Sequence, residues 1–158
     1  MLTYSRMNDS KTNQGGWEAS NLRTLLNNDI YNAMPSELRN AIINTTVVSG
    51  HGRYDSSNFT TTDKIYLLSA KEIWGSNGYY QDSAIDDTRQ LDNYEKKGVT
   101  VDNYRNATKF TPAGSSYNWW IRTACDDYRN FYHVEYSGNW SFYTADSIFG
   151  VSPAFRIA

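Results

Sequence analysis

The chain has 158 residues, a length that suits one compact domain. Its formal net charge is −2, which argues against nucleic acid as a partner. A single cysteine, Cys125, excludes an internal disulfide framework and a cysteine zinc cage, and two histidines leave little for histidine-based metal chemistry. No run approaches the roughly 18 apolar residues of a membrane span, so we expect no direct membrane insertion.

Two amphipathic helices are predicted near the start of the chain. The first is expected from Gly16 or Ser20 to about Asn28–Asp29, because leucine and isoleucine side chains recur there with helical spacing at positions 22, 25, 26 and 30. The second should begin around Pro35, with Glu37 at the positive end of its dipole. Its expected buried face consists of Met34, Leu38, Ala41 and Ile42.

From Thr45 onward the pattern predicts strands and loops. The expected strands are Val47–Val48, Ile65–Leu68, a central strand at Trp119–Arg122, a hairpin of 134–136 and 140–142 around Ser137–Asn139, and a last strand at Ala154–Ile157. Residues 75–118 are interpreted as a long irregular excursion with a short helix near Asp86–Tyr94, and His51 as a turn residue. Helices followed by an antiparallel sheet indicate an α+β class.

The composition changes in the last third of the chain. Residues 110–158 contain no Lys, Gln or Met and only one Glu, whereas the first 109 residues hold 16 residues of these four types. At that rate about seven would be expected, and a sheet-rich segment explains only part of the deficit. The stretch 126–133 is polar and aromatic without alternation, which is unusual for a strand and typical of a binding surface built from Tyr, Asn, Asp and Ser.

Several motifs, in this order, resemble one bacterial family. They are Gly15–Arg23 (GGWEASNLR), Pro35–Arg39 (PSELR), Thr62–Leu67 (TDKIYL), Ser69–Gly75 (SAKEIWG), Trp119–Arg122 (WWIR) and Gly150–Ile157 (GVSPAFRI). This order is similar to that of the DUF6273 family, a domain of unknown function, over about residues 13–158. The resemblance implies a C-type-lectin-like fold, related to that of the formylglycine-generating enzyme, in a single domain spanning residues 1–158. Leu2–Tyr4 would supply part of its first strand.

The C-terminal third also resembles the variable region of a target protein of a diversity-generating retroelement. Adenine-specific mutagenesis of AAC-type codons never yields Trp, Lys, Glu, Gln or Met, which is close to the set depleted here. Residues 117–149 would then be the variable ligand-binding region, with Glu135 and Gly138–Trp140 as fixed scaffold. The resemblance implies a phage virion or a bacterial surface or secreted protein, located by signals outside this chain, that binds a protein or glycan receptor.

Catalysis has little support in the sequence. The related enzyme fold needs redox-active cysteines, and Cys125 stands alone in the variable stretch. No proline lies in the tripeptide that binds calcium and sugar in true C-type lectins. Asp126, Asp127 and Asp146 could supply oxygen ligands for calcium, but a solvated acidic loop is the favoured interpretation. We therefore expect no enzyme activity, no cofactor and no obligatory metal.

The binding hypothesis makes the sharpest prediction, which concerns twelve side chains. They should face solvent on one contiguous patch: Asp126, Tyr128, Arg129, Asn130, Tyr132, His133, Tyr136, Ser141, Tyr143, Asp146, Ser147 and Phe149. The scaffold should bury Trp119, Trp120, Trp140 and Phe155, together with Arg122 partnered by carboxylates. The alternative hypothesis is a structural domain of a larger bacterial surface protein, in which the aromatic surface packs against another domain.

Overall fold

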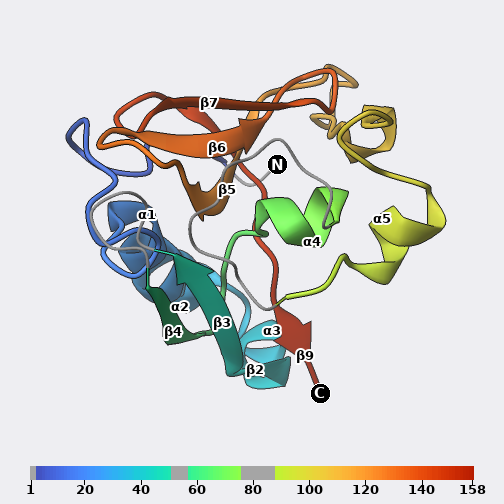
Figure 1. Cartoon of the computed structure of the whole chain (residues 1–158). Coiled ribbons are helices and arrows are strands. Elements are labelled where there is room, and N and C mark those ends of the chain that lie inside the picture. Colours follow the sequence, from blue (N-terminus) through green and yellow to red (C-terminus); the bar gives the residue numbers. More distant parts are fainter. Residues whose placement is uncertain (1–2, 51–56, 76–87) are drawn as a thin grey trace.

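The computed structural model describes residues 3–50, 57–75 and 88–158 (Figure 1). Its helical segments are α1 (Asn21–Leu25), a π-helical turn (Leu26–Ile30), α2 (Tyr31–Ala33), α3 (Ser36–Ala41), α4 (Ala70–Trp74), α5 (Asp92–Lys96) and a 3-10 turn (Arg105–Ala107). Its strands are β1 (Thr3–Ser5), β2 (Ile42–Ile43), β3 (Thr45–Gly50), β4 (Asn58–Asp63), β5 (Trp119–Ala124), β6 (Asn130–Val134), β7 (Trp140–Thr144), β8 (Phe149–Val151) and β9 (Arg156–Ile157). The mixed α+β class predicted from the sequence is confirmed.

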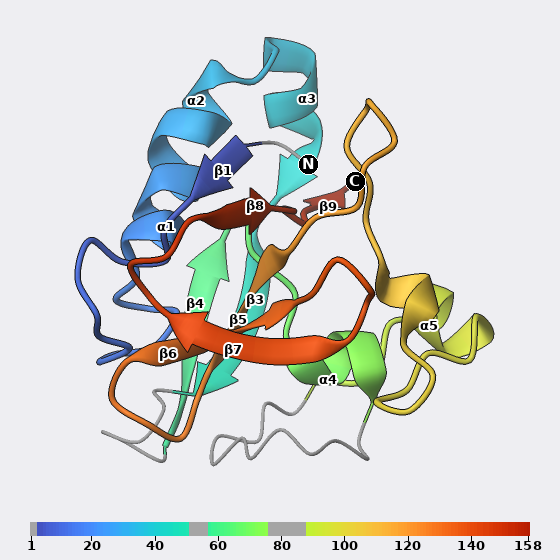
Figure 2. The same ribbon diagram turned by 90° about the horizontal axis from the view of Figure 1, so that it is seen from above.

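The largest sheet has five strands in the order β1-β8-β5-β6-β7. Its pairs are antiparallel except β5 with β8, so the sheet is mixed rather than purely antiparallel as predicted. Two further ribbons pair β2 with β9 and β3 with β4. In Figures 1 and 2 the early helices lie beside β1 and the β3–β4 ribbon, away from β6 and β7. The short strand β1 pairs with β8, close to the prediction for Leu2–Tyr4.

The first helix starts where predicted but ends later. The Ser20 side chain accepts a hydrogen bond from the Arg23 N–H, and this N-cap fixes the start at Asn21. The helical path then continues through the π-helical turn to Ala33, past the predicted end at Asn28–Asp29. The second helix does follow Pro35, but its predicted buried face is only partly buried, and the buried Ile42 belongs to β2.

The predicted strand at Ile65–Leu68 is wrong, although all four side chains are buried. Only Tyr66 forms a bridge, with Ala154. Side chains satisfy much of the remaining backbone, since Asn27 bonds both the N–H and the C=O of Ile65. An apolar run buried on all sides has no alternation that distinguishes a strand from an irregular core segment.

The central strand is confirmed as β5, and all six of its residues are buried. The hairpin is confirmed as β6–β7, but its first strand covers 130–134 rather than the predicted 134–136, so Glu135 and Tyr136 belong to the turn. Gly138 lies in the hairpin turn at φ +93°, where a Cβ atom would approach the Tyr104 carbonyl oxygen to 2.2 Å. The excursion at 75–118 holds α5 and the 3-10 turn in its described part. The predicted turn at His51 and the start of the helix near Asp86 lie outside the described residues.

Fully buried tryptophans form the centre of the core, and one of them, Trp17, donates a hydrogen bond to a buried carboxylate. Asp63, at the end of β4, accepts hydrogen bonds from the Trp17 indole at 2.9 Å and from the Arg23 guanidinium at 2.7 Å. Trp17, Trp119 and Trp120 have no exposed surface. The loop before α1 is therefore fixed to the β3–β4 ribbon through a buried carboxylate.

Candidate functional site

Two loops lie side by side at one end of the β6–β7 hairpin. The Ala145 N–H donates to the Arg129 carbonyl at 2.9 Å, which joins the loop after β7 to the loop after β5. The Ala145 carbonyl in turn accepts from the N–H groups of Met7 and Asn8. We call this region the loop-end surface; it comprises Asp126, Tyr128, Arg129, Asn130, Tyr143, Asp146 and Ser147. Ser141 pairs with His133 near the hairpin turn, so it lies outside this surface.

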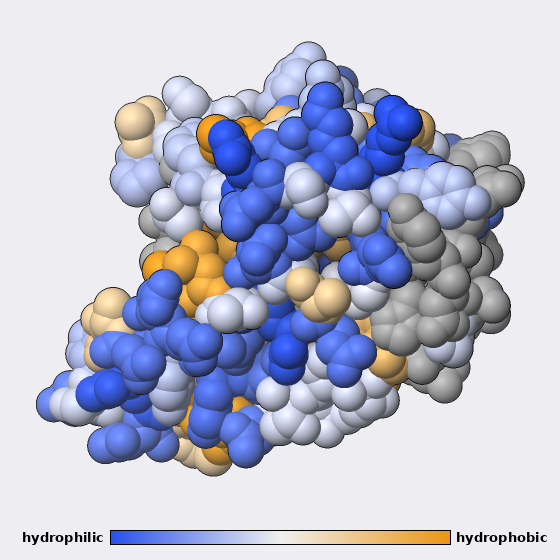
Figure 3. Space-filling view, turned by 90° about the vertical axis from the view of Figure 1, so that its left-hand side faces the viewer, coloured by the Kyte–Doolittle hydropathy of each residue, from blue (hydrophilic) through white to orange (hydrophobic). Residues whose placement is uncertain are grey.

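Figure 3 views the molecule from the left-hand side of Figure 1, where these loops lie. The surface in this view is mostly hydrophilic, with a few hydrophobic residues between the polar ones. Tyr128 and Tyr143 are half-exposed, at 50% and 57%, and Asp126 and Arg129 are also exposed. Aromatic rings set among polar groups suit recognition of a polar partner better than docking of a purely apolar one.

Asp127 stabilises the conformation of the loop after β5 through hydrogen bonds within that loop. One of its carboxylate oxygens accepts from the N–H groups of Arg129 and Asn130, both at 2.8 Å. The other accepts from the Asn130 side-chain amide at 2.6 Å. This is the Asx-turn chemistry that lets a short acidic side chain replace a backbone turn. The conformation of the loop thus depends on Asp127 and not on its exposed neighbours.

Asn13, in the N-terminal segment, donates hydrogen bonds to the backbone of the same loop. Its side chain is fully buried, and its amide nitrogen donates to the carbonyls of Cys125 and Asn130, each at 3.0 Å. Its own N–H donates to the Tyr128 carbonyl at 3.3 Å. The loop backbone is therefore anchored to the N-terminal segment, while the side chains of Asp126, Tyr128 and Arg129 face outward.

An aromatic row leads from the core to the loop-end surface along one face of the sheet. The Trp120 ring lies 4.6 Å from Phe149, and Phe149 lies 4.4 Å from His133 and 5.9 Å from Tyr143, measured between ring centroids. Trp120 is fully buried, Phe149 is partly buried and Tyr143 is exposed. The row gives the exposed ring of Tyr143 a packed aromatic base.

The prediction that His133 faces solvent is wrong, since its side chain is 3% exposed. Its ring packs between Trp120 and Phe149, and burial lowers its pKa from 6.5 to about 4. His133 therefore stays neutral at pH 7 and belongs to the sheet. The stretch that looked unsuited to a strand forms β6 from Asn130 onward, because it is covered on both faces and needs no polar alternation.

Tyr132 and Tyr136 depart from the predicted contiguous patch. Tyr132 is 5% exposed, so the prediction that it faces solvent is also wrong. It points to the opposite face from His133, where its ring lies 6.1 Å from Trp140 and 6.2 Å from Phe142. Tyr136 is exposed, but it lies in the hairpin turn at the other end of β6.

The remaining predicted residues divide by exposure. Asp126, Tyr128, Arg129, Tyr136 and Tyr143 are exposed, whereas Asn130, Ser141, Asp146, Ser147 and Phe149 are partly buried. Of the predicted scaffold, Trp119 and Trp120 are buried and Trp140 is partly buried. Phe155 is 38% exposed, so its predicted burial is wrong: it lies beside the short β9 at the edge of a two-stranded ribbon.

Sequence reasoning missed three residues around this site. Phe142 is 49% exposed although it sits in a strand, and nothing in its neighbours signals an edge position. Asp127 had a usable signal, because an aspartate in a short polar stretch favours an Asx turn, in which its side chain accepts the N–H two residues further on. Asn13 had none, since its partners are more than 100 positions away along the chain.

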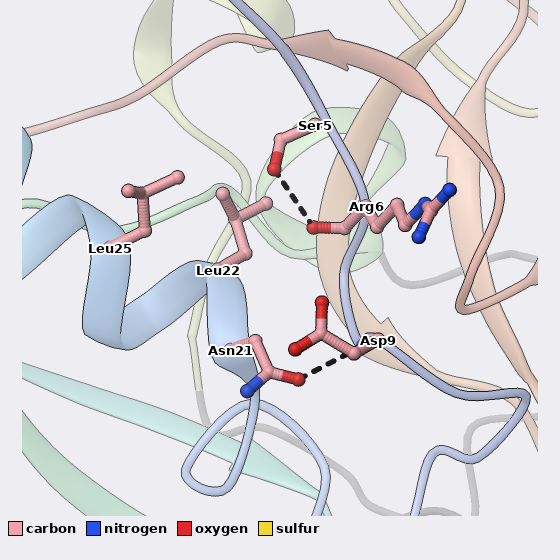
Figure 4. A pocket seen from close by; sticks show the side chains of 6 residues that line it. All are labelled: Ser5, Arg6, Asp9, Asn21, Leu22 and Leu25. Atoms are coloured by element: carbon pink, nitrogen blue, oxygen red, sulfur yellow. Dashed lines mark hydrogen bonds between the residues drawn. The ribbon is translucent and has the colours of Figure 1, made fainter.

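A separate pocket of about 240 Å³ lies between α1 and the segment that follows β1 (Figure 4). Leu22 and Leu25 project into it from α1, while the Arg6 guanidinium points away from both leucines. None of the predicted binding residues lines it. Within the described ranges, no three His, Cys, Asp or Glu side chains gather closely enough to hold a metal ion, and no helix has the length and apolar character to cross a membrane.

Comparison with known protein families agrees with the family resemblance of the sequence motifs. No curated protein and no solved structure matches the chain. The sequence profile of the family described as "Domain of unknown function (DUF6273)" matches residues 1–158. The chain therefore belongs to the DUF6273 family.

Proposed function

We propose that this chain is a non-catalytic module that binds a receptor through the loop-end surface. One observation carries the proposal: the loop backbone is bonded from within, while its exposed side chains are Tyr, Arg and Asp. Asn13 and Asp127 hold the loop, and Tyr128 and Arg129 extend from it. A surface of this kind can change its side chains without changing the fold, which is what a diversified binding site requires.

The proposed scaffold is C-type-lectin-like. The pairing of β1, near the start of the chain, with β8, near its end, supports this fold. So does the position of β5 in the middle of a sheet from which the loops project. On this scaffold the variable region, residues 117–149, combines buried framework positions in β5 and β6 with the exposed positions of the loops and of β7.

The proposed partner is a protein or glycan on a cell surface. Tyrosine supplies flat contact area with few rotors, and it stacks on sugar rings as readily as on protein side chains. Arg129 adds donors for carboxylate or carbonyl groups, and Asp126 adds acceptors for hydroxyl groups. The proposed location is a phage virion or a bacterial surface, where such a module would meet its receptor.

Nearby DNA tests the diversification part of the proposal. We expect a near-copy of the codons for about residues 117–158, with adenines at the variable positions, beside a gene for a reverse transcriptase. Asp126, Tyr128, Arg129 and Tyr143 should fall at adenine-containing codons of that copy, whereas Trp119 and Trp120 should not. A genome without such a repeat would refute diversification and leave the binding surface itself to the next experiment.

Cell binding tests the surface directly. Fluorescently labelled chain is titrated on a panel of bacterial cells and read by flow cytometry, with Arg129→Ser plus Tyr143→Ser as the site variant. The matched control is Arg105→Ser plus Phe110→Ser, which also removes one exposed arginine and one exposed ring. We expect the site variant to lose most binding and the control to retain it. Equal loss in both variants, or no binding to any cell, would contradict the proposal.

A second candidate function has an observation of its own. Ile43, Phe155 and Ile157 are exposed around the β2–β9 ribbon, away from the loop-end surface. An apolar cluster of this kind suits packing against a neighbouring domain, as expected for a structural part of a larger surface protein. The same titration separates the two functions, because a structural domain would show no saturable cell binding that depends on Tyr143.

A further inference from the structure

Strand β7 is the outer edge of the five-stranded sheet (Figure 2). Its sequence is Trp-Ser-Phe-Tyr-Thr, without a charge, a proline or a glycine. Proteins usually protect an exposed edge with lysine, proline, a bulge or a covering loop, because unpaired backbone groups invite pairing with another strand. Its ladder with β6 runs without a register shift from Asn130↔Thr144 to Val134↔Trp140.

The direction of each backbone group of β7 follows from its ladder with β6. The Glu135 N–H donates to the Asn139 carbonyl at one end, and the Ala145 N–H donates to the Arg129 carbonyl at the other. Hydrogen-bonded pairs alternate along an antiparallel ladder, so Ser141 and Tyr143 also face β6. The N–H and C=O groups of Trp140, Phe142 and Thr144 therefore point to the open edge.

Two of these six outward groups already have partners. The Trp140 N–H donates to the Asn139 side-chain oxygen at 2.9 Å, and the Thr144 carbonyl accepts from the Ser147 N–H at 2.9 Å. The four others have no partner among the described residues: the N–H and C=O of Phe142, the C=O of Trp140 and the N–H of Thr144. The pattern of free and occupied groups is symmetric about Phe142, the middle residue of the strand.

We propose that two copies of this chain pair antiparallel through their β7 strands about a two-fold axis at Phe142. In that register, Phe142 of one copy exchanges two hydrogen bonds with Phe142 of the other. The free Thr144 N–H meets the free Trp140 carbonyl of the second copy, and the reverse bond forms by symmetry. The two occupied groups face each other and need no further partner. Every free backbone group of the edge is thus used once, as an isologous interface requires.

The side chains favour the same arrangement. Phe142 and Tyr143 are consecutive, so they point to opposite faces of the sheet, yet both are about half exposed. A partner docking on one face would cover only one of them, whereas a strand added at the edge covers part of both. The two Phe142 rings would lie directly opposite each other, which is a favourable cross-strand pair. An uncharged strand meets its own copy without like-charge repulsion.

Sedimentation velocity of the whole chain over a wide concentration range tests the pairing. We expect a reversible monomer–dimer equilibrium for the unmodified chain. Phe142→Lys and Phe142→Glu should each raise the dimer dissociation constant by about tenfold or more, because each places like charges opposite each other and removes the ring pair. An equimolar mixture of the two variants should restore dimers, because Lys then faces Glu.

The matched controls are Tyr136→Lys and Tyr136→Glu, which change an exposed ring of the same hairpin outside β7. They should dimerise like the unmodified chain. A chain that stays monomeric at all concentrations would overturn the proposal, and so would dimers that the Phe142 variants do not weaken. Failure of the mixture to restore dimers would overturn the register centred on Phe142.

This inference goes beyond the proposed receptor binding and does not rest on it. If both hold, the dimer presents two loop-end surfaces, so Phe142→Lys should weaken binding to cells that carry many receptors while leaving the affinity for a single receptor nearly unchanged. Dimers without cell binding would contradict only the receptor proposal. Cell binding by a strictly monomeric chain would contradict only the β7 pairing.

Discussion

The Arg122 guanidinium and the Glu72 carboxylate form an ion pair inside the core, with Nη1 and Oε2 2.5 Å apart. Arg122 also donates to the Leu67 carbonyl at 2.8 Å and to the Ser49 hydroxyl at 3.0 Å, so its donors reach three separate segments. The same Glu72 oxygen accepts the Ser69 N–H as part of a capping box at the start of α4. Two residues of the family motifs thus join α4, β3 and β5 in one polar centre.

Breaking this pair should destabilise the fold strongly. Arg122→Met leaves a buried carboxylate and several carbonyls without donors, and Glu72→Gln leaves a buried cation without its charge partner. We expect each change to lower the free energy of unfolding by roughly 3–5 kcal/mol. Urea titration followed by tryptophan fluorescence measures this. Arg89→Met, which breaks the exposed pair with Asp92, should change stability very little.

The start of the first helix and the turn of the hairpin were predictable because each has a local signal in the sequence. Ser20 caps α1, and Gly138 occupies a turn where only glycine fits. The irregular path of Ile65–Leu68 had no such signal, because its backbone bonds depend on Asn27 and Arg122 at distant positions. A continuous apolar run indicates that a segment is buried, but it does not indicate which residues form hydrogen bonds with the backbone of that segment.

Exposure rather than residue type should decide which tyrosines the fold tolerates losing. Tyr128→Ser and Tyr143→Ser together should change the free energy of unfolding by less than about 1 kcal/mol, because both rings are half exposed. Tyr132→Ser should cost roughly 3 kcal/mol or more, and Trp120→Ala about 3–5 kcal/mol, because both rings are buried. Thermal melts of the three proteins measure this, and a destabilised double variant would show that the loop-end surface is part of the core.

His133 should make stability depend on pH in a defined window. Its pKa is 6.5 in the unfolded chain and about 4 in the folded one, so between these values the unfolded state binds more protons. Stability therefore falls as the pH is lowered from about 6.5 to about 4, by roughly 3 kcal/mol from this residue, and the effect levels off below that. Denaturant titrations of the unmodified chain and of His133→Phe measure it as a difference. Parallel curves would contradict a buried neutral imidazole.

The candidate site was only partly predictable, for a reason visible in β6. Composition identified residues 110–158 as unusual, and Tyr128, Arg129 and Tyr143 are indeed exposed. Composition cannot tell which face of a strand is covered, and both faces of β6 are covered by rings from β5, β7 and β8. His133 and Tyr132 are buried for that reason, although their residue types are as suited to a binding surface as those of their exposed neighbours.

Asp127→Ala should loosen the loop without changing any exposed residue of the proposed site. The change removes the acceptors for the N–H groups of Arg129 and Asn130, so we expect faster amide hydrogen exchange at these two positions and a loss of stability of about 1–2 kcal/mol. Exchange in β5, including Arg122, should become faster only as far as the loss of global stability requires. Asp126→Ala is the matched control, since Asp126 is exposed one position earlier.

If the proposed receptor binds a preformed loop, Asp127→Ala should weaken binding through the cost of ordering the loop, and Asp126→Ala should act only through its own lost contact. Unchanged exchange at 129 and 130 in the Asp127 variant would show that Asn13 alone fixes the loop.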